Sequence, residues 1–134
     1  MAKLTKVEGI GEVYAQKLAE AGISTTGAFL EQGASPQGRK DIAGKTGISD
    51  KLILEWLNHI DLFRVQGVGE EYADLLEAAG VDTVPELAQR NADNLYDKLG
   101  QVNAEKSLVR QLPGKNQVAS WAAHAKDLPR KITY

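Results

Sequence analysis

Residues 7–23 read Val7-Glu-Gly-Ile-Gly-Glu-Val-Tyr-Ala-Gln-Lys-Leu-Ala-Glu-Ala-Gly-Ile23, and the same pattern recurs 58 positions later as Val65-Gln-Gly-Val-Gly-Glu-Glu-Tyr-Ala-Asp-Leu-Leu-Glu-Ala-Ala-Gly-Val81. Both copies have a Gly-apolar-Gly turn and then Tyr, Ala, Leu and Ala at positions i, i+1, i+4 and i+7. This spacing puts the four side chains on one side of a helix, so each turn is expected to open an amphipathic helix. The chain is therefore a tandem duplication.

The two turns are Gly9-Ile10-Gly11 and Gly67-Val68-Gly69. We predict that the first glycine of each opens a bend too tight for a Cβ atom, and that the second supplies backbone freedom where the helix starts. The apolar residue between the glycines is expected to point inward. Gly22 and Gly80 follow the helices, where a left-handed residue commonly ends a helix.

Backbone N–H groups at such a turn are available to bind an anion, typically a nucleic-acid phosphate. Residues 65–82 carry five acids and no base, a local charge of −5 that opposes phosphate, whereas residues 3–20 carry three lysines and three glutamates. The first turn is therefore the electrostatically plausible site. The candidate nucleic-acid-binding residues are Lys6, Gly9, Ile10, Gly11 and Lys17, and by repeat equivalence Gly67, Val68 and Gly69.

The pattern resembles the tandem helix-hairpin-helix proteins of DNA repair and recombination. Over nearly its whole length the chain is also similar to an uncharacterised bacterial domain family. This closer resemblance is carried by the two turns and by Gly38-Arg39-Lys40-Asp41-Ile42-Ala43, Thr46-Gly47-Ile48-Ser49, Arg110-Gln111-Leu112-Pro113, Trp121 and Ala125-Lys126. It implies an all-α fold and names no activity.

Composition sets the remaining bounds. The 134 residues are 43% apolar and 25% charged, which is typical of a soluble domain with one core. Cysteine is absent, which excludes disulfides and thiolate metal sites. No long apolar run or signal sequence is present, so we expect a cytoplasmic protein with no membrane contact. The net charge of −2 requires any phosphate-binding surface to be local.

Capping residues predict the other helices. The expected features are a helix from Thr25 or Thr26 to Gly33, one from Ser35-Pro36 to Gly47, the longest from Ser49 towards Phe63, one opened by a Thr83-Val84-Pro85-Glu86 capping box, one capped by Asn91, one over Lys115–Lys126, and an extended tail Ile132-Thr133-Tyr134. No strand pattern competes with them.

The duplication extends beyond the turns. Trp56-x-x-His59 matches Trp121-x-x-His124 at an offset of 65, so about seven residues entered the second half, near 107–114. The helix with Trp56 leads directly into the second turn, and no low-complexity linker separates the halves. We therefore predict one domain, 1–134, made of repeat 1–64 and repeat 65–134.

Other functional readings have simpler structural explanations. Residues 42–56 resemble a helix-turn-helix whose reading face would be Ser49, Asp50, Lys51, Leu54 and Glu55, but two carboxylates suit a major groove poorly. His59 and His124 lack further ligands at metal spacing, so no metal site is predicted. Glu70, Asp74 and Glu77 share a helix face, which a solvated surface explains without a nuclease. No catalytic residue is predicted.

We expect a non-enzymatic module that binds the DNA or RNA backbone without sequence specificity and needs no cofactor. The alternative is a protein-interaction or self-association module, in which the acidic residues Glu70, Glu71, Asp74 and Glu77 meet a basic surface. Bases concentrate outside the turns, in residues 98–131 and at Arg39, Lys40, Lys45 and Lys51.

Overall fold

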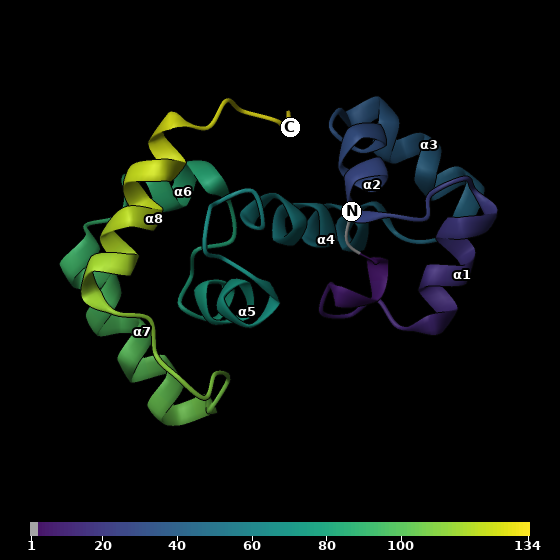
Figure 1. Cartoon of the computed structure of the whole chain (residues 1–134). Helices are drawn as coiled ribbons and strands as arrows, with labels where there is room; N and C mark the ends of the chain where they lie inside the picture. The colour runs from purple at the N-terminus through teal and green to yellow at the C-terminus, as the bar shows by residue number, and fades with distance from the viewer. Residues whose placement is uncertain (1–2) are drawn as a thin grey trace. The chain divides into compact units, whose positions relative to one another are not determined.

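The computed structural model describes residues 3–134, and within them every named element is helical (Figure 1). This confirms the all-α prediction. The elements are η1 (Leu4–Lys6), α1 (Glu12–Glu20), α2 (Thr26–Gln32), α3 (Pro36–Thr46), α4 (Asp50–Leu62), α5 (Glu70–Ala78), α6 (Val84–Gln89), α7 (Ala92–Lys106) and α8 (Lys115–Asp127). The only β-type pairing among the described residues is an isolated antiparallel bridge between Lys3 and Thr25.

The chain divides into two compact units. Unit 1 contains the residues up to Asp61 together with Lys131–Tyr134, and unit 2 contains Leu62–Arg130. The boundary lies near the predicted repeat boundary of 64/65, but the last four residues belong with the first unit. That the two repeats form a single folding domain stays a prediction.

In unit 1, hydroxyl side chains open three successive helices. Thr25 Oγ1 accepts the Ala28 N–H at 3.1 Å, and Ser35 Oγ accepts the Gly38 N–H at 3.1 Å. Ser49 Oγ accepts the Leu52 N–H at 3.2 Å. These bonds satisfy amides that have no partner inside the helix, which is why the caps could be predicted from sequence.

In unit 2, Thr83 and Asn91 cap α6 and α7, as predicted. The capping box at Thr83 is only half formed, because the Glu86 carboxylate accepts from Arg90 Nε at 3.1 Å instead of returning to the cap. The prediction that the helix after Ser49 is the longest is wrong: α4 has 13 residues and α7 has 15. α7 is also four residues longer than α3, the corresponding helix of the first half, and this difference accounts for part of the second half's insertion.

The rest of the insertion is the connection over residues 107–114. Ser107 ends α7 in a left-handed conformation, with φ of 50°. Asn103 then fastens the loop, because its amide nitrogen donates to the Val109 carbonyl at 3.1 Å and its amide oxygen accepts the Val109 N–H at 2.9 Å. Tyr72 reaches the same loop and donates to the Gln111 carbonyl at 3.1 Å.

Each unit packs a tryptophan against its turn. The Tyr14 and Trp56 ring centroids are 5.0 Å apart in unit 1, and those of Tyr72 and Trp121 are 5.2 Å apart in unit 2. Phe29 adds a second edge contact to Trp56 at 6.4 Å. Both tryptophans are buried and both tyrosines are half-buried, so each contact joins the core to the turn.

The first glycine of each turn is required by both space and conformation. Gly9 has φ of 93° and Gly67 has φ of 92°, which side chains rarely adopt. A Cβ atom would lie 3.0 Å from the indole Nε1 of Trp56 at Gly9, and 3.0 Å from that of Trp121 at Gly67. The prediction of a bend too tight for a Cβ is confirmed at both positions.

The predicted role of the second glycine is wrong. Gly11 and Gly69 have φ of −89° and −98°, and a Cβ atom at either would meet nothing within 4 Å. They are N-cap residues in extended backbone that any residue can adopt. The closing glycines behave as predicted, since Gly22 and Gly80 are left-handed with φ of 86° and 92°.

A histidine holds the second turn. Nδ1 of His124, on α8, accepts the backbone N–H of Gln66 at 2.9 Å. His124 is half-buried, and its position explains why a histidine follows Trp121 by one helical turn.

Substituting serine at the two glycines of one turn separates their roles. We expect Gly67→Ser to lower the free energy of unfolding by about 1–3 kcal/mol, because it forces a positive φ and crowds Trp121. Gly69→Ser supplies a good N-cap and should change stability by less than about 0.5 kcal/mol. Urea denaturation measures both. Equal effects of the two substitutions would contradict this assignment.

Removing the imidazole of His124 should loosen the second turn. We expect His124→Ala to lower the free energy of unfolding by about 0.5–1.5 kcal/mol, since water replaces the lost acceptor at this exposed amide. Hydrogen exchange should accelerate at the Gln66 amide. Lys126→Ala, an exposed change on the same helix, is the control. An unchanged Gln66 exchange rate in His124→Ala would refute the role given to this histidine.

Candidate functional site

The first turn presents unused backbone donors to solvent. Gly9, Gly11 and Glu12 are exposed, and within residues 3–134 their N–H groups have no acceptor. Gly11 caps α1 without a side-chain hydrogen bond. The Ile10 N–H donates to the Val7 carbonyl at 3.0 Å, and the Ile10 side chain is 3% exposed, as predicted for an inward-pointing residue. Gly9, Gly11 and Glu12 can therefore offer N–H groups to an anion, whereas Ile10 anchors the turn.

Two lysines lie on the elements that flank this turn. Lys6 is the last residue of η1, and Lys17 is in the last turn of α1. Both are exposed, and the Lys17 ammonium lies 5.9 Å from the centre of the Tyr14 ring. Glu8 and Glu12 are exposed on the same segment, so the surface has cations without a net positive charge.

The second turn has the same backbone and a different surface. The Val68 N–H donates to the Val65 carbonyl at 3.0 Å, matching Ile10, and the Val68 side chain is 5% exposed. Gly67 and Gly69 are exposed. The Gln66 N–H is already bound by His124, whereas the equivalent Glu8 N–H has no acceptor within residues 3–134.

Acidic side chains surround the second turn. We call Glu70, Glu71, Asp74 and Glu77 of α5 the acidic strip. Glu70, Glu71 and Glu77 are exposed and Asp74 is half-buried. Glu70 and Glu71 are in the first turn of α5, where carboxylates also stabilise the positive end of the helix dipole. Their repulsion disfavours a phosphate at this turn.

Several bases have partners within the fold, and one of them is buried. Arg39 is only 6% exposed and donates to two backbone carbonyls, a role that the sequence did not indicate. Arg90 pairs with Glu86 at 3.1 Å, and the Lys115 ammonium lies 3.5 Å from the Asp93 carboxylate. A buried cation needs hydrogen-bond acceptors, and one acceptor of Arg39 lies 94 positions away, so no local pattern distinguishes Arg39 from its exposed neighbour Lys40.

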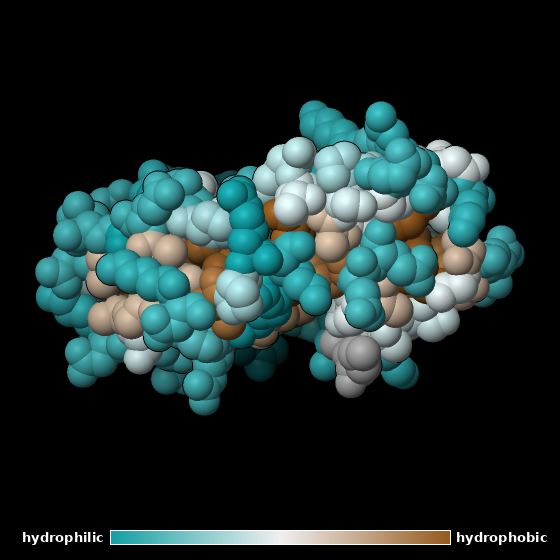
Figure 2. Space-filling model, turned by 90° about the horizontal axis from the view of Figure 1, so that it is seen from above, coloured by the Kyte–Doolittle hydropathy of each residue, from teal (hydrophilic) through white to brown (hydrophobic). Residues whose placement is uncertain are grey.

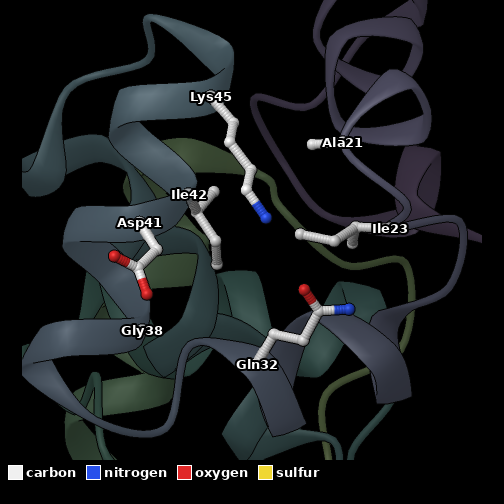
Figure 3. A pocket seen from close by; sticks show the side chains of 7 residues that line it. All are labelled: Ala21, Ile23, Gln32, Gly38, Asp41, Ile42 and Lys45. Carbon is white, nitrogen blue, oxygen red and sulfur yellow. The ribbon is translucent and has the colours of Figure 1, made fainter.

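Unit 1 contains a pocket of about 220 Å³ between the end of α1, α2 and α3. Ile23 and Ile42 form apolar walls, and the Lys45 ammonium and Gln32 carboxamide reach into it (Figure 3). Sites for small organic ligands are usually about 300–1,000 Å³. We assign no ligand to this pocket.

The two other sequence hypotheses concern a metal site and a helix-turn-helix. No group of three or more His, Cys, Asp or Glu side chains within residues 3–134 is placed to hold a metal ion. His59 is 3% exposed, and His124 binds a backbone amide. Two residues of the reading face of the helix-turn-helix hypothesis have structural roles: Ser49 caps α4, and Leu54 is half-buried.

Figure 2 shows a mostly hydrophilic visible face, with apolar residues between the polar ones. Among the residues that the structure describes, no helix is both long enough and apolar enough to cross a membrane.

Comparison with curated proteins and with solved structures finds no significant match. Residues 8–128 match a family described as a domain of unknown function, DUF4332. The matched region covers both turns, both tryptophans and the insertion before α8. The chain therefore belongs to the DUF4332 family.

Proposed function

We propose that this protein is a non-enzymatic, tandem helix-hairpin-helix module that binds the nucleic-acid backbone through its first turn. The N–H groups of Gly9, Gly11 and Glu12 would donate to a phosphate, and Lys6 and Lys17 would neutralise its charge. Ile10 would contribute by holding the turn rather than by contact.

The observation that carries the proposal is the set of exposed, unused amides in the first turn beside two exposed lysines. Amides at a helix start point their N–H dipoles outward and favour an anion there. Gly9 supports this arrangement indirectly, because Trp56 packs against it and fixes the bend.

The second turn would serve chiefly in packing. Its net charge of −5 over residues 65–82 repels phosphate, and the Gln66 amide is occupied. One phosphate-binding turn with little net charge predicts weak binding. Because phosphate contacts release counterions and do not read base edges, binding should fall with salt and should be indifferent to base sequence.

Charge reversal at the two lysines tests this site. We expect Lys6→Glu with Lys17→Glu to weaken binding of a fluorescein-labelled duplex or single strand by roughly tenfold or more at 50 mM salt, since two phosphate contacts become repulsive. Fluorescence anisotropy gives the dissociation constant. The matched control is Lys40→Glu with Lys51→Glu, because these bases are exposed on the same unit and flank neither turn.

Comparable losses in the two double variants would mean that overall charge, not the first turn, governs binding. No binding of the parent to either probe at 50 mM salt would end the nucleic-acid proposal. Circular dichroism should confirm that both variants retain the helical fold.

The acidic strip supports a second candidate, a protein-interaction module. Exposed carboxylates on one helix guide association with a basic surface more than they add affinity. On this reading the protein self-associates at low salt, and Glu70→Lys with Glu71→Lys abolishes the association. Sedimentation velocity at several protein concentrations measures it. Each substitution should cost only about 0.3–1 kcal/mol of stability through the helix dipole. A parent that stays monomeric throughout would remove support for self-association.

A further inference from the structure

The segment Lys131–Tyr134 belongs to unit 1 and is bound there through its backbone and its side chains. We call Gly33, Ala34, Arg39 and Asn58 the tail-binding surface. We propose that this surface is a recognition site for an extended peptide with the pattern aliphatic, hydroxyl, tyrosine, and that Ile132-Thr133-Tyr134 is its occupant from the same chain. The site is independent of the nucleic-acid proposal, because it uses neither turn.

The backbone of the occupant is bound on both sides. The Thr133 N–H donates to the Ala34 carbonyl at 2.8 Å, and its carbonyl accepts from Arg39 at 2.7 Å. The Thr133 hydroxyl also donates to the Ala34 carbonyl at 3.2 Å. Backbone pairing of this kind gives affinity for an extended segment, while side chains on either side give selectivity.

The flanking side chains supply that selectivity. Ile132 is 2% exposed, so the surface accepts an aliphatic side chain at this position. The Tyr134 hydroxyl donates to Asn58 Oδ1 at 2.8 Å, and its ring centre lies 5.9 Å from the Arg39 guanidinium. A charged residue in place of Ile132, or a residue without a hydroxyl donor in place of Tyr134, would lose these contacts.

Arg39 gives the surface a positioned donor for a peptide carbonyl. One guanidinium nitrogen is fixed by the Gly33 carbonyl at 2.8 Å, and another donates to the Thr133 carbonyl. The 6% exposure is that of Arg39 with the tail in place, and without the tail this guanidinium nitrogen would face water. A carbonyl of another peptide would then take the place of the Thr133 carbonyl as its acceptor.

The chain's own tail competes with any external peptide. The segment is joined covalently to the rest of unit 1 through unit 2, and a tether within one chain gives an effective concentration of up to about the millimolar range. External binding is therefore expected when the tail is removed or weakened. The external ligand is a peptide of this pattern from another polypeptide, and a second copy of this chain is one source.

The probe is a fluorescein-labelled peptide with the sequence of residues 129–134. We expect a variant ending at Arg130 to bind it saturably, and the full chain to bind at least about tenfold more weakly because of the tail's effective concentration. Arg39→Lys in the shortened variant should abolish binding, since lysine cannot bridge two carbonyls in a fixed fork. Lys40→Ala, the exposed neighbour, is the control. A peptide with Asp at the Ile132 position should not bind.

A shortened variant that is folded by circular dichroism and does not bind the peptide would overturn the proposal. So would equal binding to the Arg39→Lys variant. If the shortened variant does not fold, the full chain is titrated with unlabelled peptide, and displacement of the Thr133 amide resonance is measured by NMR. No displacement at about 5 mM peptide, within the effective-concentration range, would likewise overturn it. Dimers of the full chain that Ile132→Asp abolishes would support exchange between copies.

Discussion

In each unit an indole ring lies against a glycine that has a positive φ. Trp56 covers Gly9, and Trp121 covers Gly67, so closely that a Cβ atom at either glycine would lie 3.0 Å from the indole Nε1. This contact joins the turn before α1 to α4, and the turn before α5 to α8. The tyrosine in the first turn of α1 or α5 packs on the same indole, so the tryptophan contacts both the turn and the helix that follows it.

Most buried positions of the two turns and their helices are alike, although exposed Lys17 corresponds to fully buried Leu75, and most of the differences are on the surface. Core positions are constrained because close-packed interiors tolerate little change in volume, whereas exposed positions bear no such limit. The first turn thus has lysines and unused amides, and the second has five acids and an amide bound by His124. Two turns of one backbone can therefore have different chemistry, and the proposed phosphate site is assigned to only one of them.

Interactions within one helical turn were predictable from sequence. Thr25, Ser35 and Asn91 cap helices because their oxygens reach an amide three residues later. Predictions failed where a residue could take either of two roles that its spacing allows equally well. Glu86 could have completed a capping box, but Arg90 offers a charged donor one helical turn away. Gly11 looked like a flexible turn residue, but the bend is made at Gly9.

The sequence established the repeat, the all-α fold, the caps and the contrast in charge between the turns, because each rests on spacing or composition within a short window. Folding alone revealed what Arg39, Gln66 and the tail do. Arg39 meets Thr133 across 94 positions, and Gln66 meets His124 across 58. Such pairs leave no periodic signal, since their partners are brought together only when the helices pack. The sequence does not distinguish a buried arginine from an exposed one. Burial of the guanidinium depends on the carbonyl acceptors that folding places around it.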